Sequence, residues 1–184
     1  MSEQTAIIQC ISGNVSEFAK LYEAYVQPVY RFIYYKTHHR ETAEDITSAT
    51  FMKALEKIQT FNPNKASFKT WLYQIARNNV IDHYRSHKES MDIEDVWDIN
   101  TGENIETDTD TKMKLDSVRE YLKKLKPEQR EIVVLRVWDG RSFQEIAEIT
   151  GKTEASCKMM FKRTVDKLRG DMAVLALLIY FINN

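Results

Sequence analysis

The sequence contains few cysteines and glycines, and it has no apolar run long enough to cross a bilayer. The two cysteines, Cys10 and Cys157, have no spaced partners, so we expect reduced thiols rather than a disulfide framework or a zinc site. The longest apolar run, at 172–182, has 11 residues, whereas a membrane-spanning helix needs roughly 20. The N-terminus also lacks the basic region of a signal peptide. These absences predict a cytoplasmic protein with no membrane span.

Catalytic patterns are lacking as well. With five glycines in 184 residues, the sequence has no phosphate-cradling glycine loop, and it has no nucleophile elbow. His83 and His87 are four residues apart and could share one helix face near Asp82 and Glu89. Such a pair alone is a weak signal for a metal site. We therefore expect no enzyme activity, no metal and no cofactor.

The net charge of −1 conceals a segregation of charge along the chain. Residues 1–88 carry eleven Lys or Arg and eight Asp or Glu, and residues 112–184 carry fifteen and ten. Residues 89–111 carry nine acidic residues and no basic one. Basic blocks favour phosphate contact, whereas an acidic segment without helical periodicity is typical of a flexible linker. We predict an all-α protein with two small helical domains, at 1–88 and 113–184, joined by an acidic linker at 89–112.

Helical patterns follow one another through the first block. An apolar stripe from Phe18 to Tyr25 has helical spacing. Thr42 and the acidic residues after it fit a capping box that would begin a second helix, at 42–60. Pro63 breaks that helix, and Ser67 can cap a third one. The buried face of the third helix is expected to comprise Phe68, Trp71, Leu72 and Ile75.

The outer face of the third helix and the turn before it form a candidate surface for melted nucleic acid. Aromatic, amide and basic side chains are mixed there, and such mixtures stack on unpaired bases and bind their backbone. Trp71 falls on the apolar side, which favours a core role, whereas Tyr73 and Arg77 fall outside it. The alternative is an ordinary solvated face. The candidate residues are Asn62, Asn64, Lys65, Ser67, Lys69, Tyr73, Arg77, Asn78 and Arg85.

Residues 127–168 have the pattern of three helices that end in a helix-turn-helix. Pro127 suits a first helical position, and Gly140 is expected to end that helix. Ser142 begins a capping box, Gly151 supplies a left-handed turn, and Thr153 caps the last helix. The inward stripe of the last helix is expected to comprise Cys157, Phe161, Val165 and Leu168.

The opposite face of the last helix is basic, and a helix-turn-helix places such a face in the DNA major groove. Lys and Arg bind guanine edges or phosphates, and the tips of Met159 and Met160 could contact thymine methyl groups. The alternative is a solvated charged face on a helical hairpin, which the Gly151 turn and the capped helix before it disfavour. The candidate residues for duplex DNA are Ser156, Lys158, Met159, Lys162, Arg163 and Lys167.

Two sets of motifs resemble those of a known family. Segments 43–46, 51–55, 68–79 and 81–85 resemble the promoter-melting domain of bacterial RNA polymerase sigma factors. Segments 125–132 and 142–151, with the basic residues that follow, resemble the minus-thirty-five domain of the same proteins. The order and spacing of the motifs, over roughly 15–88 and 113–169, are similar to those of the small extracytoplasmic-function (ECF) class of the sigma-70 family.

The resemblance implies a role for each surface. Asp45 and Ser48 would dock on the RNA polymerase core, at the clamp helices of its largest subunit. The turn at 62–67 would capture a flipped base of the minus-ten non-template strand, which the next helix would hold. The second basic face would bind the duplex minus-thirty-five element, and the acidic linker would pass near the RNA exit path. The implied function is promoter recognition, strand opening and transcription initiation.

Some features depart from the family pattern. Ala49 stands where the family often has an acidic residue, and Met159 and Met160 replace residues that are commonly Ser and Arg. The apolar tail at 172–182 has no obvious counterpart; it either packs on the second domain or docks a partner such as an anti-sigma factor. The alternative function is a stand-alone helix-turn-helix regulator that binds operator duplex without polymerase.

Overall fold

The computed structural model describes residues 3–87, 122 and 124–168, and the regular structure in these ranges is helical. The chain divides into two compact units, Met1–Ile99 and Asn100–Asn184. The predicted all-α fold with two helical regions is confirmed. Within the described ranges, no helix combines the length and the apolar character that a membrane span requires. The predicted linker and the tail at 172–182 lie outside the described residues.

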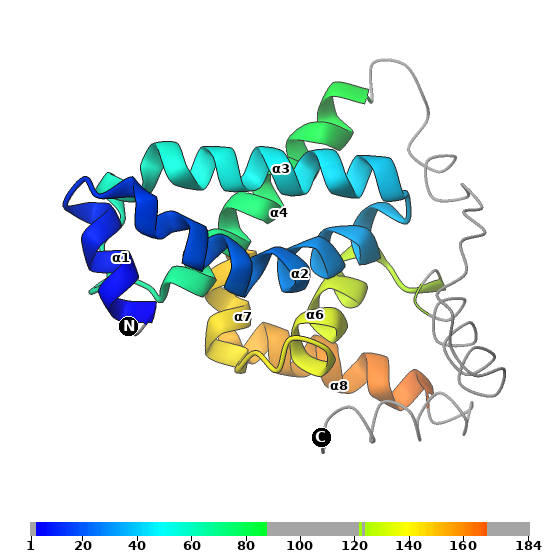
Figure 1. The fold of residues 1–184 in the computed structure, drawn as a ribbon. Coiled ribbons are helices and arrows are strands. Elements are labelled where there is room, and N and C mark those ends of the chain that lie inside the picture. The colour runs from blue at the N-terminus through cyan, green and yellow to red at the C-terminus, as the bar shows by residue number, and fades with distance from the viewer. Residues whose placement is uncertain (1–2, 88–121, 123, 169–184) are drawn as a thin grey trace, which may run out of the picture. The chain divides into compact units, whose positions relative to one another are not determined.

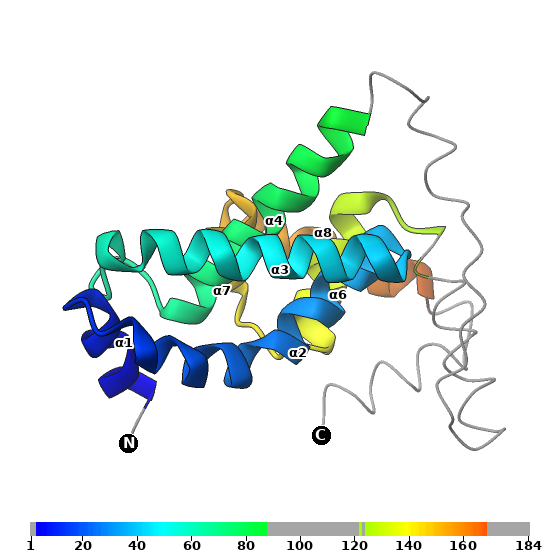
Figure 2. The ribbon, with the colours of Figure 1, turned by 45° about the horizontal axis from the view of Figure 1, so that its top comes forward.

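Three long helices, α2, α3 and α4, form the body of the N-terminal unit (Figures 1 and 2). Its elements are α1 (Glu3–Ile11), η1 (Val15–Glu17), α2 (Phe18–Thr37), α3 (Arg40–Lys57), η2 (Ile58–Thr60) and α4 (Phe68–His87). Helix α2 packs against both α3 and α4, and α3 packs against α4. Helix α1 packs against α2 and η2. Two faces of α4 are therefore covered by neighbouring helices, which leaves it a narrow exposed face.

The core of this unit is rich in aromatic side chains. The rings of Phe32 in α2 and Tyr73 in α4 lie 5.0 Å apart, and both side chains are fully buried. Phe18 in α2 and Phe51 in α3 form an edge-to-face pair at 6.5 Å. Burying a large apolar side chain contributes about 1.5–3 kcal/mol relative to leaving it exposed. Packing therefore holds the three helices together more than helix propensity does.

The turn between α2 and α3 differs from the prediction. The capping box predicted at Thr42 is wrong, because α3 already begins at Arg40 and its N-cap is His39. The Nδ1 atom of His39 accepts a hydrogen bond from the Thr42 backbone N–H at 3.3 Å. His38 ends α2 in the left-handed conformation, with a φ of 52°, and its N–H donates to the Tyr34 carbonyl. Two adjacent histidines thus make the tight turn, and α3 starts earlier than its sequence pattern suggests.

The C-terminal unit is built around a helix-turn-helix. Its described helices are α6 (Pro127–Val137), α7 (Phe143–Thr150) and α8 (Glu154–Leu168), and each packs against the other two. Pro127 occupies the first position of α6, as predicted. The predicted end of this helix at Gly140 is wrong: α6 ends at Val137, and Gly140, with a φ of 63°, turns the loop that follows. The fully buried residues where the helices meet include Ile132, Leu135, Ile146 and Cys157.

Local capping sets the ends of α7 and α8 as predicted. The Ser142 hydroxyl accepts a hydrogen bond from the Glu145 N–H at 3.1 Å, and the Glu145 carboxylate accepts one from the Ser142 N–H at 2.8 Å. Gly151 ends α7 with a φ of 70°. The Thr153 hydroxyl accepts a hydrogen bond from the Ser156 N–H at 3.2 Å. Each of these bonds satisfies a backbone group that the helix itself leaves without a partner.

A buried arginine joins α6 to the segment before it. The Nε atom of Arg130 donates to the Leu122 carbonyl at 2.7 Å, and Nη2 donates to the Leu125 carbonyl at 3.4 Å. A planar guanidinium can donate to several carbonyls at once. Arg130 therefore fixes the path of the chain into α6.

Candidate nucleic-acid interface

The turn that precedes α4 is exposed and internally braced. The side-chain oxygen of Asn62 accepts a hydrogen bond from the Asn64 N–H at 2.9 Å, and the Lys65 N–H donates to the Asn62 carbonyl at 3.0 Å. The Ser67 hydroxyl accepts from the Thr70 N–H at 3.1 Å, which confirms Ser67 as the cap of α4. The side chains of Asn62, Asn64, Lys65 and Ser67 are all exposed. The turn thus presents polar groups to solvent, and two of them, Asn62 and Ser67, also brace the backbone.

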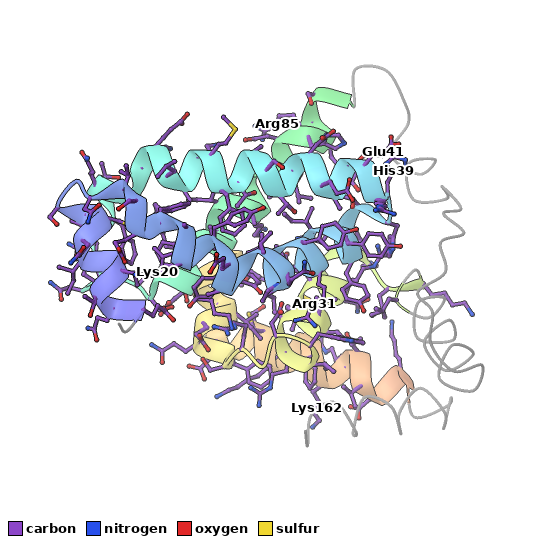
Figure 3. The ribbon with its side chains drawn as sticks, in the orientation of Figure 1. Lys20, Arg31, His39, Glu41, Arg85 and Lys162 are labelled. Carbon is purple, nitrogen blue, oxygen red and sulfur yellow. The ribbon has the colours of Figure 1, made fainter. Side chains whose placement is uncertain are left out.

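The exposed face of α4 continues the polar surface of this turn. Asn78 and Arg85 are exposed, whereas Lys69 and Arg77 are half-buried. Figure 3 shows Arg85 near the C-terminal end of α4. Asn78 and Arg85 are seven residues apart and so lie on the same side of the helix. The α4 surface is defined here as Asn62, Asn64, Lys65, Ser67, Lys69, Arg77, Asn78 and Arg85.

Tyr73 does not belong to the α4 surface, so its predicted contact with nucleic acid is wrong. Its side chain is 0% exposed and packs against Phe32, because α2 covers the side of α4 on which it lies. Trp71 is half-buried, with its ring 5.0 Å from that of Phe61 and 5.6 Å from that of Phe68. These contacts support the predicted core role of Trp71. The α4 surface therefore consists of amides, a hydroxyl and cations rather than exposed tyrosines.

The sequence interpretation missed a polar link between α3 and α4. The side-chain amide of Asn79 donates to the Thr50 hydroxyl at 3.1 Å, and its oxygen accepts from the Lys53 ammonium at 3.1 Å. Thr50 is fully buried and donates in turn to the Ile46 carbonyl at 2.7 Å. The sequence shows an asparagine next to Asn78, but the side of α4 that faces α3 is visible only in the structure. This link fixes how α4 lies against α3.

Helix α3 carries an exposed stripe of mixed character. Asp45 and Ser48 are exposed, as their predicted role requires. Met52 is 64% exposed and Leu55 is exposed as well. The four residues follow one another at spacings of three and four, so they lie on one face. This α3 stripe offers an acidic group at one end and apolar groups at the other.

The exposed face of α8 is strongly basic. Lys158, Lys162, Arg163 and Lys167 are exposed, as is Met159, whereas Ser156 is half-buried. Figure 3 shows Lys162 pointing away from the body of the C-terminal unit. Lys158 makes an ion pair with Glu154 at 2.7 Å, one turn earlier on the same helix. The α8 surface is defined here as Ser156, Lys158, Met159, Lys162, Arg163 and Lys167.

Charged side chains brace the corner between α6 and α7. Arg141 is buried and donates to the Glu145 carboxylate at 2.6 Å. Burial alone would raise the pKa of Glu145, but hydrogen bonds from Ser142 and the Arg141 charge outweigh it and hold that pKa below its usual value. Arg136 lies over the Phe143 ring at 4.9 Å, a cation–π contact. These contacts fix the corner between α6 and α7, and the Phe143 ring lies 5.6 Å from the Phe161 ring in α8.

A hollow of about 460 Å³ separates the beginning of α6 from α8. Its lining residues are Lys126, Pro127, Glu128, Gln129, Ser156, Met159, Met160 and Arg163. The exposed face of α8 is therefore not flat but is bounded on one side by the start of α6. In the described part of the chain, no group of three or more His, Cys, Asp and Glu residues is placed to hold a metal ion.

Comparison with known proteins assigns both units. The model of sigma-70 region 2 matches residues 21–90, and the model of sigma-70 region 4 matches residues 115–168. The RNA polymerase sigma factor YlaC of Bacillus subtilis is 31% identical over 160 residues, which cover 83% of this chain and 90% of YlaC. The chain belongs to the sigma-70 family.

Further relatives place this sigma factor in the ECF class. The ECF RNA polymerase sigma factor BldN of Streptomyces coelicolor is 37% identical over 166 residues, covering 85% of this chain. The chain spans 61% of the length of BldN. The ECF sigma factor SigM of Bacillus subtilis is 29% identical over 151 residues, covering 82% of this chain and 91% of SigM. This sigma factor binds RNA polymerase and directs transcription from promoters, and a stand-alone regulator is not favoured.

Solved structures share the fold of this sigma factor. CnrH, in complex with the cytosolic domain of CnrY, has a TM-score of 0.70 at 22% identity, covering 91% of this chain and 95% of that one. The sigma factor RpoE of Bartonella quintana, in complex with the anti-sigma factor NepR, has a TM-score of 0.70 at 24% identity. That match covers 84% of this chain and 95% of RpoE.

Proposed function

We propose that this sigma factor divides promoter recognition between two surfaces. The α4 surface holds the melted non-template strand of the minus-ten element, and the α8 surface binds the duplex minus-thirty-five element. One observation carries the proposal: Arg85 on α4 and Lys162, Arg163 and Lys167 on α8 are exposed, opposite the buried faces of the two helices. Exposed cations can reach the phosphates of DNA.

The turn at 62–67 captures one base that leaves the stack. Extruding a base costs a few kcal/mol, and a pocket or platform on the protein must offset that cost. With Tyr73 in the core, the α4 surface offers the amides of Asn62, Asn64 and Asn78 as hydrogen-bonding groups for a base edge. Arg77 and Arg85 neutralise the backbone of the same strand. Capture therefore depends on hydrogen bonds and charge rather than on stacking against tyrosine.

The α8 surface enters the major groove as the recognition element of the helix-turn-helix. Lys162, Arg163 and Lys167 lie within about one and a half turns and reach phosphates or guanine edges from one side. Each phosphate neutralised contributes about 0.9 to the slope of log affinity against log salt. The braced corner at Arg141 and Glu145 supports this helix through the contact between Phe143 and Phe161.

The α3 stripe docks on the polymerase core. Asp45 supplies an exposed negative charge, and Met52 and Leu55 supply apolar area that would otherwise face water. An exposed charge next to exposed apolar groups is the usual composition of a docking surface, with a desolvated centre and a polar rim. Asn79 links α4 to α3, so docking of the α3 stripe also holds the strand-binding helix in place.

The remaining assignments follow from this division. The chain performs no covalent chemistry and uses no cofactor, because the polymerase supplies catalysis. It acts on DNA in the cytoplasm. The acidic segment at 89–112 passes near the RNA exit path, where its charge mimics that of nucleic acid. An anti-sigma factor is a further partner, as it is in the complexes of RpoE with NepR.

The polymerase assignment is tested by reversing one charge. Asp45→Arg is expected to weaken binding to purified core polymerase about tenfold or more, because a like charge placed in an interface costs several kcal/mol. Far-UV circular dichroism and the thermal midpoint should stay at wild-type values, because Asp45 is exposed. Glu23→Arg makes the same charge change at an exposed site on α2 and should leave core binding unaltered.

Two outcomes would contradict the proposal. Unchanged core binding by Asp45→Arg would show that the α3 stripe is not the docking face. Tight binding of the wild-type chain to duplex DNA as a dimer, without polymerase, would favour the stand-alone regulator instead.

A further inference from the structure

Two neighbouring methionines on α8 have different environments. Met159 is 52% exposed, whereas Met160 is half-buried and the adjacent Cys157 is fully buried. Because successive helical residues differ by about 100° in direction, Met160 turns toward the body of the unit and Met159 toward solvent. Of the two side chains that the sequence offered as thymine contacts, the structure leaves Met159 as the one that reaches outward.

Met159 lies in the middle of the basic face. Ser156 precedes it by three residues, and Lys162 and Arg163 follow it by three and four, so all four share one side of the helix. Met159 and Met160 both line the hollow beside the start of α6, but Met159 is the more exposed of the two. An apolar tip thus lies between a hydroxyl and two cations on the first half of the recognition helix, which is the half that meets base edges in a helix-turn-helix.

Thymine presents a unique apolar group in the major groove, its C5 methyl. Cytosine has a hydrogen at that position and exposes an amino group, and the purines expose only polar atoms there. A methionine side chain is unbranched, flexible and polarisable, and it can adapt to such a methyl group. It offers no hydrogen bond to the polar edges of the other bases, so a wrong base would leave its own polar edge desolvated.

We propose that Met159 is a specificity-determining residue that selects a thymine in the minus-thirty-five element through the thymine methyl group. This proposal rests on the assignment of the α8 surface to that element. Lys162 and Arg163 bind the flanking phosphates, which carries no sequence information, or hydrogen-bond to neighbouring guanines. The cognate element therefore contains at least one thymine whose methyl group, rather than its polar edge, is recognised.

The test removes the methyl group and nothing else. The full chain, bound to core polymerase, first selects fragments from a promoter library randomised across the minus-thirty-five element. Each enriched thymine is then replaced by deoxyuridine, which pairs identically but lacks the methyl. At one position we expect about fourfold weaker binding, because a buried methylene-sized group contributes about 0.8 kcal/mol.

Two variants assign the effect to its side chain. Met159→Ala should bind thymine and deoxyuridine fragments equally well, and alanine at an exposed helix position should not disturb folding. Met160→Ala is the matched control, with the same chemical change on the adjacent residue, and should keep the fourfold preference. The salt dependence of binding should be the same for wild type and Met159→Ala, because no charge is removed.

The outcomes distinguish the role of Met159 from the assignment of the α8 surface to the minus-thirty-five element. A selected element without thymine, or equal affinity for thymine and deoxyuridine at every position, overturns the role of Met159 while the α8 surface keeps its function. A preference that persists in Met159→Ala overturns it too. Failure to enrich any minus-thirty-five sequence would instead refute the assignment of the α8 surface.

Discussion

Replacing Asn79 by alanine should weaken the contact between α3 and α4, and Asn79 is not one of the residues assigned to DNA binding. The substitution removes two hydrogen bonds of Asn79. Their partners are Thr50 and Lys53, which lie 29 and 26 residues away in the sequence. A net contribution of about 0.5–1.5 kcal/mol is typical for one such bond. Lys53 is only half-buried, so its ammonium can be hydrated again when Asn79 is removed. The contribution of the Lys53 hydrogen bond is therefore at the low end of this range. We expect a loss of about 2 kcal/mol in the N-terminal unit.

Hydrogen exchange followed by mass spectrometry can measure this loss locally. A loss of about 2 kcal/mol corresponds to about 30-fold faster exchange of protected amides that open with the unit. Peptides from α3 and α4 should show this acceleration in Asn79→Ala. Peptides from α6 and α8 should exchange at wild-type rates, since Asn79 has its hydrogen bonds within the N-terminal unit.

The neighbouring residue provides a matched control. Asn78 is exposed and is assigned to the α4 surface, so Asn78→Ala should leave exchange in α3 and α4 within about threefold of wild type. It should instead weaken binding to a single-stranded minus-ten fragment in the presence of core polymerase. If Asn79→Ala leaves the exchange of α3 and α4 unchanged, the polar link does not stabilise the helix contact and the reasoning is refuted.

Three further predictions concern the turn, the corner and the basic face. His38→Gly should raise the free energy of unfolding by about 1 kcal/mol in denaturant titrations, because a side chain at a φ of 52° is strained; no change would mean that contacts of the imidazole compensate. Because the folded-state pKa of Glu145 is lowered, its contribution to stability is complete above the usual carboxyl range and is lost as pH falls through the folded value. Thermal midpoints should therefore fall less on acidification in Glu145→Gln than in wild type, and parallel curves would contradict this. Arg163→Ala should lower run-off transcription and reduce the slope of log promoter affinity against log salt concentration by about 1. The thermal midpoint should not change, because the side chain is exposed. An unchanged slope would show that Arg163 does not contact phosphates.

The helix-turn-helix could be predicted closely because its signals are local. Ser142, Gly151 and Thr153 act within three residues of their own position, by hydrogen bonds or by backbone conformation. Such chemistry does not depend on what packs against the helix. The exposed basic face of α8 followed from the same pattern, since α8 packs on the unit with one side only.

Helix α4 was less predictable because it is covered on two sides. A wheel drawn from the apolar stripe Phe68, Leu72 and Ile75 places Tyr73 outside, but α2 covers that position and buries it against Phe32. The sequence does contain a second apolar stripe, Tyr73, Ala76 and Val80, but it does not show which helix covers that stripe. The same limit hid Asn79, whose polar side chain points toward α3 rather than toward solvent.

The predicted start of α3 was wrong for a different reason. Both Thr42 and His39 can cap a helix through a side-chain acceptor, and Thr is by far the commoner cap. The left-handed conformation of His38 decides the matter, because it ends α2 two residues before Arg40. Non-glycine residues seldom adopt that conformation, so the sequence pattern favoured the later start.

The most direct test of the division between the two surfaces is a double-mutant cycle between protein and promoter. The measured quantity is the affinity of core-bound sigma factor for a fragment with a duplex minus-thirty-five element and a single-stranded minus-ten overhang. Removing the element should weaken wild-type binding about tenfold but Arg163→Ala binding less than about threefold, while both proteins keep their preference for the overhang. An equal loss for both proteins, or a lost overhang preference in Arg163→Ala, would contradict the account.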